Sequence, residues 1–487
     1  MRGEVRFLTA VVALMLSASC APSGAPSGSH AGGAATGAAT TTPPATVSSP
    51  PASPGAASAA TAAPEIAVTL FKNVRIFDGK AEKLTNPSNV MVRGNIIERV
   101  SSVSIQPPAD VDVTVIDGGG RTLMPGLIDA HVHAMLIRPT PAQAIGGDVG
   151  YNNIAAAAEA TDTLLRGFTK VRDVGGPTFG LKQAIDEGII AGPRIFPSGA
   201  MITTTGGHGD FRQLYELPRT IGTLSRVEQI GGSAIADSPD EVRVRVREQL
   251  MQGASQIKLA AGGGVSSPHS PIDVSLFTEA EQRAAVEAAE NWGTYVTVHA
   301  FTPAAIQRAI AAGVRCIEHG VFMDEATAKL MAEKGVWLSA QPIPGEMRES
   351  FPAGSSQRAK FDEAWRGIAR TYELAKKYKL KTAFGTDVLF SQALAQQLGA
   401  MLASLVRWYT PAEALVMATG TNAQLLALSG KRSPYPGKLG VVEEGALADL
   451  LLVDGNPIAD IKLVADPAKN FVLIMKDGKI YKNTLPR

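Results

Sequence analysis

The middle of the chain alternates between short apolar runs and longer helical patterns, and this alternation limits the possible folds more than any other feature. The strand-like runs lie at 127–133, 169–173, 194–202, 256–260, 295–299, 316–319, 337–341 and 382–387. Helix starts lie between several of them: Ser238 and Thr278 are each followed three residues later by Glu, and Thr410 precedes a proline. Such strand–helix units predict an α/β protein with a (β/α)8 TIM barrel. A doubly wound sheet is the competing topology, but no Gly-x-Gly-x-x-Gly motif opens a first strand-to-helix turn.

Two β-rich regions flank this middle. The first contains runs at 68–77, 89–100 and 113–116, and the second contains runs at 439–442, 448–453, 471–475 and 478–481. Asp-Gly pairs and glycine clusters separate the runs, as expected for tight turns. We therefore predict a small β-sandwich domain built from both ends of the chain, residues 65–124 and 432–487, around a barrel of residues 125–431.

The N-terminus has the pattern of a secretory signal. Arg2 and Arg6 precede an apolar run at 7–16, and small residues lead from it to Cys20. Cys20 is similar to the lipidated cysteine of bacterial lipoproteins, although Ser17 stands where such signals usually carry Leu. Cleavage near Ala18 without lipid is the alternative, and an incidental cysteine is a third. Residues 1–20 are therefore predicted to be a signal peptide of the lipoprotein type.

Residues 21–64 consist almost entirely of Ala, Ser, Gly, Thr and Pro. This composition cannot bury a core, so it predicts a disordered tether. The protein is thus expected to be exported, either periplasmic or anchored to the membrane and facing away from the cytoplasm. A lipid on Cys20 would be its one membrane attachment, because no later apolar run is long enough to span a bilayer.

Composition excludes one large class of partners. The 487 residues carry a formal net charge of +1, with 45% hydrophobic and 19% charged residues. Nucleic-acid binding usually leaves a basic surface, and this balance shows none. The expected partner is a small molecule.

The apolar run that follows Pro125-Gly126 ends in His131-Val132-His133. In a strand this spacing puts both imidazoles on one face, where two neutral rings can chelate a metal ion. The last polar residues of other runs are Lys258, His299, His319 and Asp387. Catalytic groups of a barrel lie at the C-terminal strand ends, so these side chains are expected to converge.

These segments resemble the amidohydrolase superfamily over nearly all of residues 66–487. The matching text is 125–133, 171–175, Ile257-Lys258, 298–300, 317–320, 385–387, 448–450 and 476–479. The stretches 204–210 and 262–265 most resemble the imidazolonepropionase-related branch that contains Xaa-Pro dipeptidases.

The resemblance implies a binuclear metal site. Lys258 would be carboxylated by CO₂ and would bridge two divalent ions, because a carbamate offers oxygens that a protonated lysine lacks. His131, His133 and Asp387 would complete one metal site, and His299 and His319 the other. Zn²⁺ suits such ligands, but Mn²⁺, Co²⁺ or Fe²⁺ fit the same set. The metals would share a water and lower its pKa, while Asp387 takes its proton and passes it to the leaving amine.

Other residues have weaker assignments. His208, in a glycine-rich loop, is expected to contact the substrate carbonyl or carboxylate, and a loop-stabilising imidazole is the alternative. Two interpretations stay open for His269: it contacts the substrate, or it lies in a surface loop without a role in binding. Arg172 and Asp173 either orient metal ligands or form a structural ion pair, and Cys316 is expected to be a small buried side chain. Four arginines are available for a substrate carboxylate: Arg212, Arg219, Arg226 and Arg348.

The sequence thus predicts an exported metal-dependent amidohydrolase. Its substrate would be a dipeptide such as Xaa-Pro or an N-acyl amino acid, and its nucleophile a hydroxide between the metals. One alternative is a cyclic amide, lactone or ester hydrolase on the same scaffold, with either two metals or one. Another is an inactive lipoprotein that binds a ligand.

Overall fold

The computed structural model describes residues 67–109, 111–219 and 222–486. The predicted signal peptide, Cys20 and the tether at 21–64 lie outside these residues. None of the described helices combines the length and the apolar character needed to cross a bilayer.

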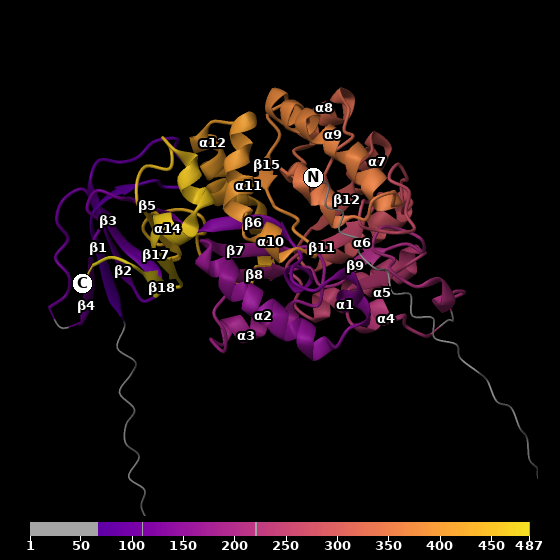
Figure 1. Ribbon diagram of the computed structural model, residues 1–487, viewed down its shortest axis with the longest axis horizontal. Coiled ribbons are helices and arrows are strands. Elements are labelled where there is room, and N and C mark those ends of the chain that lie inside the picture. The colour runs from indigo at the N-terminus through magenta and orange to yellow at the C-terminus, as the bar shows by residue number, and fades with distance from the viewer. Residues whose placement is uncertain (1–66, 110, 220–221, 487) are drawn as a thin grey trace, which may run out of the picture. The chain divides into compact units, whose positions relative to one another are not determined.

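Strands from both ends of the chain share one eight-stranded sheet (Figure 1). The sheet consists of β1 (Val68–Ile76), β2 (Ser88–Arg93), β3 (Ile96–Ser101), β4 (Val113–Asp117), β5 (Thr122–Pro125), β16 (Leu450–Val453), β17 (Phe471–Lys476) and β18 (Lys479–Asn483). Its order is β18-β17-β16-β5-β1-β2-β3, and β4 pairs with β1. Residues such as Phe71, Val90, Leu452 and Leu473 form its core.

Strand β1 joins the two halves of this sheet into one. The sequence had predicted a sandwich of two separate sheets instead. Its first residues pair with β2 and β4, and Arg75 and Ile76 pair with β5. The register shifts between Phe71 and Val74, in the way that a β-bulge bends a strand. The bend lets one strand serve both halves.

The middle of the chain forms parallel strands and helices, so the described residues have an α/β fold, as predicted. A three-stranded sheet contains β6 (Leu127–Val132), β7 (Phe168–Asp173) and β8 (Arg194–Pro197). A seven-stranded sheet contains β9 (Met201–Thr203), β10 (Ser233–Ile235), β11 (Ile257–Ala260), β12 (Val296–Ala300), β13 (Cys316–His319), β14 (Trp337–Ala340) and β15 (Thr382–Phe384). All of these strands are buried along their length, as parallel strands covered on both faces must be.

The predicted single strand at 194–202 is wrong. It is two strands, β8 and β9, which belong to different sheets. Gly199 between them has a φ of +73°, and the backbone amide of Ala200 donates to the side chain of Gln249 on α5. The chain therefore turns at Gly199, and β9 pairs with β10 and β11.

Hydrogen bonds link the two parallel sheets at two places. The amide of Asp387, just beyond β15, donates to the carbonyl of His131 on β6 at 2.9 Å. Just before β11, the side-chain amide of Gln256 donates to the carbonyls of Asp173 on β7 and Phe196 on β8, each at 2.9 Å. The first link sets the end of β15 beside the end of β6.

Helices connect the parallel strands (Figure 1). They are α1 (Pro141–Gly146), α2 (Val149–Leu165), α3 (Phe179–Asp186), α4 (Arg226–Gln229), α5 (Pro239–Met251), α6 (Glu279–Asn291), α7 (Pro303–Ala312), α8 (Glu325–Lys334) and α9 (Ser356–Lys377). Four more helices follow β15, namely α10 (Gln392–Ala395), α11 (Leu398–Ser404), α12 (Pro411–Val416) and α13 (Asn422–Leu426), and α14 (Pro467–Asn470) lies between β16 and β17. Thr278 begins α6 with a full capping box, as predicted, and Thr410 begins α12 with the predicted proline at the first helical position and a capping box as well. Ser238 caps α5, but the carboxylate of Glu241 accepts from Asp237 instead of from Ser238.

A buried ion cluster fastens the β-rich end of the chain to the parallel strands. The carboxylate of Asp449, next to β16, lies 2.7 Å from the ammonium of Lys170 on β7 and 3.0 Å from the guanidinium of Arg194 on β8. Burial alone would raise the pKa of Asp449, but the two positive charges lower it by more than burial raises it. The pKa of Asp449 is therefore below its ordinary value. The cluster therefore stabilises the fold only while Asp449 is ionised.

Replacing Asp449 with Asn is expected to reduce the free energy of unfolding by about 3 kcal/mol at pH 7, because the buried Lys170 loses its carboxylate partner and Arg194 keeps only Asp477. A depressed pKa gives stability that is present above the unfolded value near pH 4 and is lost in more acidic solution. The difference between wild type and D449N should therefore shrink below about pH 4. Urea unfolding at several pH values measures it. Asp454→Asn, whose partner Arg121 lies at the surface, is the matched control and should cost less than about 1 kcal/mol. An equal loss in both variants would contradict the prediction.

Candidate active site

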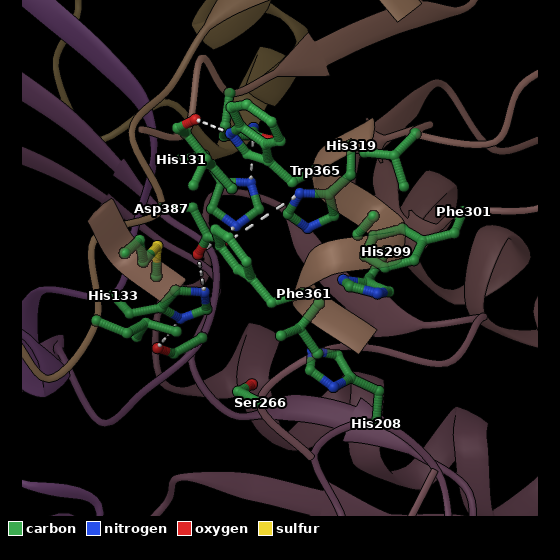
Figure 2. A pocket seen from close by; sticks show the side chains of 18 of the residues that line it. His131, His133, His208, Ser266, His299, Phe301, His319, Phe361, Trp365 and Asp387 are labelled. Carbon is green, nitrogen blue, oxygen red and sulfur yellow. Dashed lines mark hydrogen bonds and ion pairs between the residues drawn. The ribbon is translucent and has the colours of Figure 1, made fainter. Parts of the chain in front are cut away.

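The polar strand-end residues line one pocket at the C-terminal ends of the parallel strands (Figure 2). The pocket has a volume of about 1140 Å³, including its open mouth. The predicted residues that line it are His131, His133, His208, Lys258, His299, His319 and Asp387. The structure thus brings together side chains that lie up to 256 positions apart in the sequence, from 131 to 387.

Three of these side chains form a tight cluster. Nε2 of His131 and Nε2 of His133 lie 3.3 and 3.4 Å from Oδ1 of Asp387 (Figure 2). One ligand atom from each residue lies within 4.8 Å of the others, an arrangement that can hold a metal ion. All three side chains are largely buried, so few water molecules compete for these atoms.

The outer nitrogens of both imidazoles already have partners. Nδ1 of His131 lies 2.7 Å from Oε2 of Glu318, and Nδ1 of His133 lies 2.9 Å from the carbonyl oxygen of Gly175. A carboxylate and a carbonyl can only accept, so Nδ1 carries the proton, and in a neutral ring Nε2 presents a lone pair. Two such lone pairs and a carboxylate oxygen face one another. This donor set fits a divalent metal ion.

The charges around His131 and Asp387 also favour a positive charge between these two side chains. Burial lowers the pKa of His131, but the charges and hydrogen bonds of Asp387 and Glu318 together raise it above the ordinary value. The opposite holds for Asp387: burial raises its pKa, while His131, His133 and His319 bring it well below the usual range. Asp387 is therefore an ionised carboxylate at neutral pH.

Lys258 lies on β11 and is buried in the same pocket. Within the described part of the chain, its ammonium forms no hydrogen bond or ion pair. Burial lowers the pKa of Lys258 below its ordinary value, although Glu318 and Asp387 oppose this. The neutral amine, which is the form that reacts with CO₂, is thus more accessible than in a solvated lysine. The carbamate itself stays a prediction.

The remaining imidazoles form a row. Ring centroids are 4.8 Å apart between His131 and His319, 4.5 Å between His319 and His299, and 4.2 Å between His299 and His208. Nε2 of His299 lies 2.8 Å from the carbonyl oxygen of Gly263, so Nδ1 is its free lone-pair atom. Burial lowers the pKa of His319 and of His208 to about 3, so both rings are neutral at pH 7. Neutral rings can ligate a metal or donate one hydrogen bond.

Two of the strand-end residues have unusual backbone conformations. His319 and Asp387 have φ angles of +73° and +53°, in the left-handed region that non-glycine residues rarely adopt. Such strain is typical of functional sites, where surrounding structure holds it. The chain also passes close to β6: a Cβ on Gly385 would lie 2.5 Å from Cβ of His131. A glycine at position 385 is therefore needed to bring Asp387 beside His131.

Glu318 was not singled out as a site residue in the sequence. It is fully buried, its Oε1 lies 2.6 Å from Nη2 of Arg172, and Thr297 also donates to it. Arg172 thus holds the carboxylate that orients His131, which is the orienting role considered for it. A charged residue between Ile317 and His319 in an apolar strand was the available signal, since a buried carboxylate needs a partner.

Asp173 and Cys316 also lie in this buried layer. The carboxylate of Asp173 accepts from the backbone amides of Ala134 and Gly175, at 2.8 and 3.2 Å, and so holds the turn after His133. The thiol of Cys316 is buried 3.5 Å from Oε1 of Glu318. Both residues support the site without facing the pocket.

The walls of the pocket are apolar. They are formed chiefly by Phe211, Val265, Phe301, Val321, Ile343, Met347, Phe351, Phe361, Trp365, Ile368, Leu389 and Phe390. Met347 belongs to the short helix η3 (Gly345–Ser350), and Phe361 and Trp365 belong to α9. Lys360 on α9 holds the loop after β11 by donating to the carbonyls of Gly264, Ser267 and Ser270 at 2.6 to 3.0 Å. The loop and the helix therefore form one continuous wall.

His208 lines this pocket and has a ring nitrogen without a hydrogen-bond partner among the described residues. This nitrogen is Nδ1, and it is buried. A Cβ on Gly264 would come within 2.3 Å of the His208 ring, so only glycine leaves room for it. An unpartnered buried nitrogen of this kind can serve a bound ligand.

The structure does not support His269 as a substrate contact. His269 lines neither this pocket nor the cavity next to it, and its Nε2 lies 3.2 Å from the carbonyl oxygen of Arg212. It stabilises a loop, which was the alternative.

The four candidate arginines do not line the pocket either. Arg212, Arg219 and Arg348 are paired with Asp210, Glu241 and Asp362, and Arg226 lies near the carbonyl of Gly147. Each guanidinium therefore has a structural partner, so the expectation that one holds a substrate carboxylate is not supported.

Known proteins match the chain across this whole region. A sequence model described as the Amidohydrolase family matches residues 122–482. Ochratoxinase of Aspergillus niger is 30% identical over 447 residues, which cover 86% of this chain and 87% of that protein. A prolidase solved with N-methylphosphonate-L-proline has a TM-score of 0.79 at 33% identity, covering 86% of this chain and 100% of that one. A Xaa-Pro dipeptidase solved with methionine in its active site has a TM-score of 0.72 at 32% identity, covering 85% and 100%.

Proposed function

Since this chain belongs to the amidohydrolase family and is therefore a hydrolase of carbon–nitrogen bonds, we propose that it hydrolyses the amide bond of a dipeptide such as Xaa-Pro or of an N-acyl amino acid. The reaction would depend on two divalent metal ions, for which Zn²⁺ is the first candidate. His131, His133 and Asp387 would hold one ion, and His299 and His319 the other. A carbamate on Lys258 would bridge them.

One observation carries this proposal: the free lone pairs of His131, His133 and Asp387 point at a common centre while the opposite nitrogens of both imidazoles are committed elsewhere. Structural histidines in a core normally use both nitrogens for hydrogen bonds within the protein. Here the protein orients the rings but leaves the inner atoms for a cation. The names of the relatives, prolidase and ochratoxinase, support an amide substrate.

Bound divalent ions supply a polarised substrate carbonyl and a water of lowered pKa. The residues of the chain do the rest. Asp387 is ionised, so its carboxylate takes the proton of the attacking water and then gives it to the departing amine nitrogen. His208 is neutral, so its ring donates one hydrogen bond to the substrate carbonyl or carboxylate. The apolar walls exclude water from the reacting amide.

We also propose that the two parallel sheets belong to one (β/α)8 barrel. The hydrogen bonds of Asp387 and Gln256 between the two sheets support it. Domain limits at 65–124 and 432–487 for the β domain and at 125–431 for the barrel are part of this proposal. Export, with lipid attachment at Cys20, is proposed from the sequence of residues 1–64 alone.

The proposed function is tested by metal content and hydrolysis in one sample. We expect about two divalent ions per chain, and release of the amino acid from Ala-Pro or N-acetylproline. A chelator should reduce hydrolysis by at least about 100-fold, and added Zn²⁺ should restore it. Mass spectrometry of the metal and chromatography of the products give both readings. A chain with one ion would favour the mononuclear alternative. Undiminished hydrolysis by metal-free protein would overturn the metal mechanism.

A further inference from the structure

A second apolar cavity adjoins the pocket that holds the candidate metal ligands. Its volume is about 1860 Å³, including its open mouth. It lies among α1, the start of α2, α4 and η3, and is lined by residues such as Ala144, Val149, Asn153, Val227 and Ile230. None of these residues belongs to the metal cluster, and the proposed mechanism does not use them.

The two cavities share part of their walls. The residues that line both are Leu136, Phe211, Gly232, Ser266, Met347, Phe351, Leu389 and Phe390. Ser266 is on view in Figure 2, in the same pocket as His208 and Asp387. A ligand held at the metal ligands can therefore extend past these shared side chains into the second cavity.

The second cavity carries no charged lining. Among the described residues around it there is no Asp, Glu, Lys, Arg or His, and its polar members are neutral amides and hydroxyls such as Asn153 and Thr140. In the first pocket, the charged or titratable residues are the predicted metal ligands, His208 and Tyr372. An ammonium or carboxylate placed in the second cavity would lose its hydration and gain no counter-charge.

We propose that the second cavity binds the acyl part of the substrate, and that this acyl part is a large, uncharged, apolar group. The inference rests on the proposed function and narrows it to N-acylated amino acids with long or multi-ring acyl groups. A free dipeptide carries an ammonium on its acyl side, which the cavity cannot stabilise. The carboxylate on the amine side stays in the first pocket, where Nδ1 of His208 is an available donor.

A series of substrates tests this inference in the full-length, metal-loaded protein. N-acetylproline, N-octanoylproline and the dipeptide Ala-Pro share one leaving group and differ on the acyl side. Burial of each additional CH₂ favours binding roughly fourfold, so kcat/KM should be at least about tenfold higher for octanoyl than for acetyl. Ala-Pro should be the poorest substrate.

Adjacent positions on α2 provide the variant and its control. Asn153 lines the second cavity, whereas its neighbour Ile154 is 72% exposed and lines neither cavity. Asn153→Trp should obstruct part of the second cavity and lower the octanoyl-to-acetyl ratio of kcat/KM, because the acyl chain loses part of its site. Ile154→Trp adds the same bulk and should keep the wild-type ratio.

The outcomes separate this inference from the function on which it rests. Equal kcat/KM for octanoyl and acetyl substrates, or the same ratio in N153W and I154W, would overturn the inference while leaving amide hydrolysis intact. If no substrate is hydrolysed, the proposed function fails, and calorimetric titration with octanoylproline and acetylproline still tests the cavity. Tighter binding of the octanoyl compound that N153W alone reduces would support the site, and equal binding would overturn it.

Discussion

Replacing Asp387 with asparagine is expected to lower kcat by about 10³- to 10⁴-fold while most of the bound metal is retained. The asparagine keeps the size of the side chain and one oxygen for the cluster with His131 and His133, but it cannot accept the proton of the attacking water. Steady-state kinetics and metal content, measured on the same preparation, check both halves of the prediction.

Asp362→Asn is the matched control for this change. Asp362 lies on α9 near the pocket, where it pairs with Arg348, and it does not line the pocket. Its replacement should leave kcat within about twofold of wild type, because surface pairs contribute little. Near-normal kcat in D387N would show that the proton transfer is assigned to the wrong residue.

Replacing Lys258 with methionine is expected to remove most of the bound metal and to lower kcat by more than about 10³-fold. Methionine fills a similar volume but cannot form a carbamate. Lys258→Arg separates the carbamate from a simple positive charge: arginine stays protonated and cannot react with CO₂, so it should be as inactive as methionine.

A direct measurement of the carbamate accompanies these variants. Protein loaded with metal in the presence of ¹³C-bicarbonate should show a carbamate signal by NMR in wild type, and K258M should lack it. Activity in the Lys258→Arg variant, or wild-type protein that loads metal fully without CO₂ and gives no such signal, would count against the bridge.

Much of the candidate site could be predicted from the sequence because its residues stand at strand ends. The apolar run before His131 and the two-residue spacing to His133 specify a strand and a shared face, and these are local properties. His319 and Asp387 each close an apolar run in the same way, and Lys258 and His299 are the last polar residues of theirs. In an α/β fold with parallel strands, ends of one polarity meet at one side, so convergence followed from topology without knowledge of any contact.

Local pattern was less informative where the backbone changes direction. The run at 194–202 contains Pro197, Ser198 and Gly199, residue types that are common in turns, but the prediction of a single strand passed over them. In the structure Gly199 divides the run between two sheets. Strand β1 is a similar case, in which a register shift lets one strand serve both halves of the β-rich sheet. These are choices among backbone conformations that a glycine or a bulge permits, and pairing partners decide between them.

Whether a loop residue is free to bind a substrate depends on partners that are distant in the sequence. Three side chains could bind a carboxylate by their chemistry: Arg212, Arg348 and His269. In the structure Arg212 pairs with Asp210, Arg348 pairs with Asp362, and His269 contacts a backbone carbonyl. A side chain in a loop is free or committed according to what the fold brings beside it. Residue type alone therefore could not distinguish His208, whose Nδ1 lacks a partner, from His269.

By itself the sequence determined the α/β character and which side chains stand at strand ends, since both follow from the local period of apolar residues. Only the tertiary structure decided how those side chains are oriented. The link from Arg172 through Glu318 to His131 joins three strands, and the shared wall of two cavities joins several loops. Hydrogen-bond partners and cavities arise between segments far apart in the chain, and no local pattern encodes them.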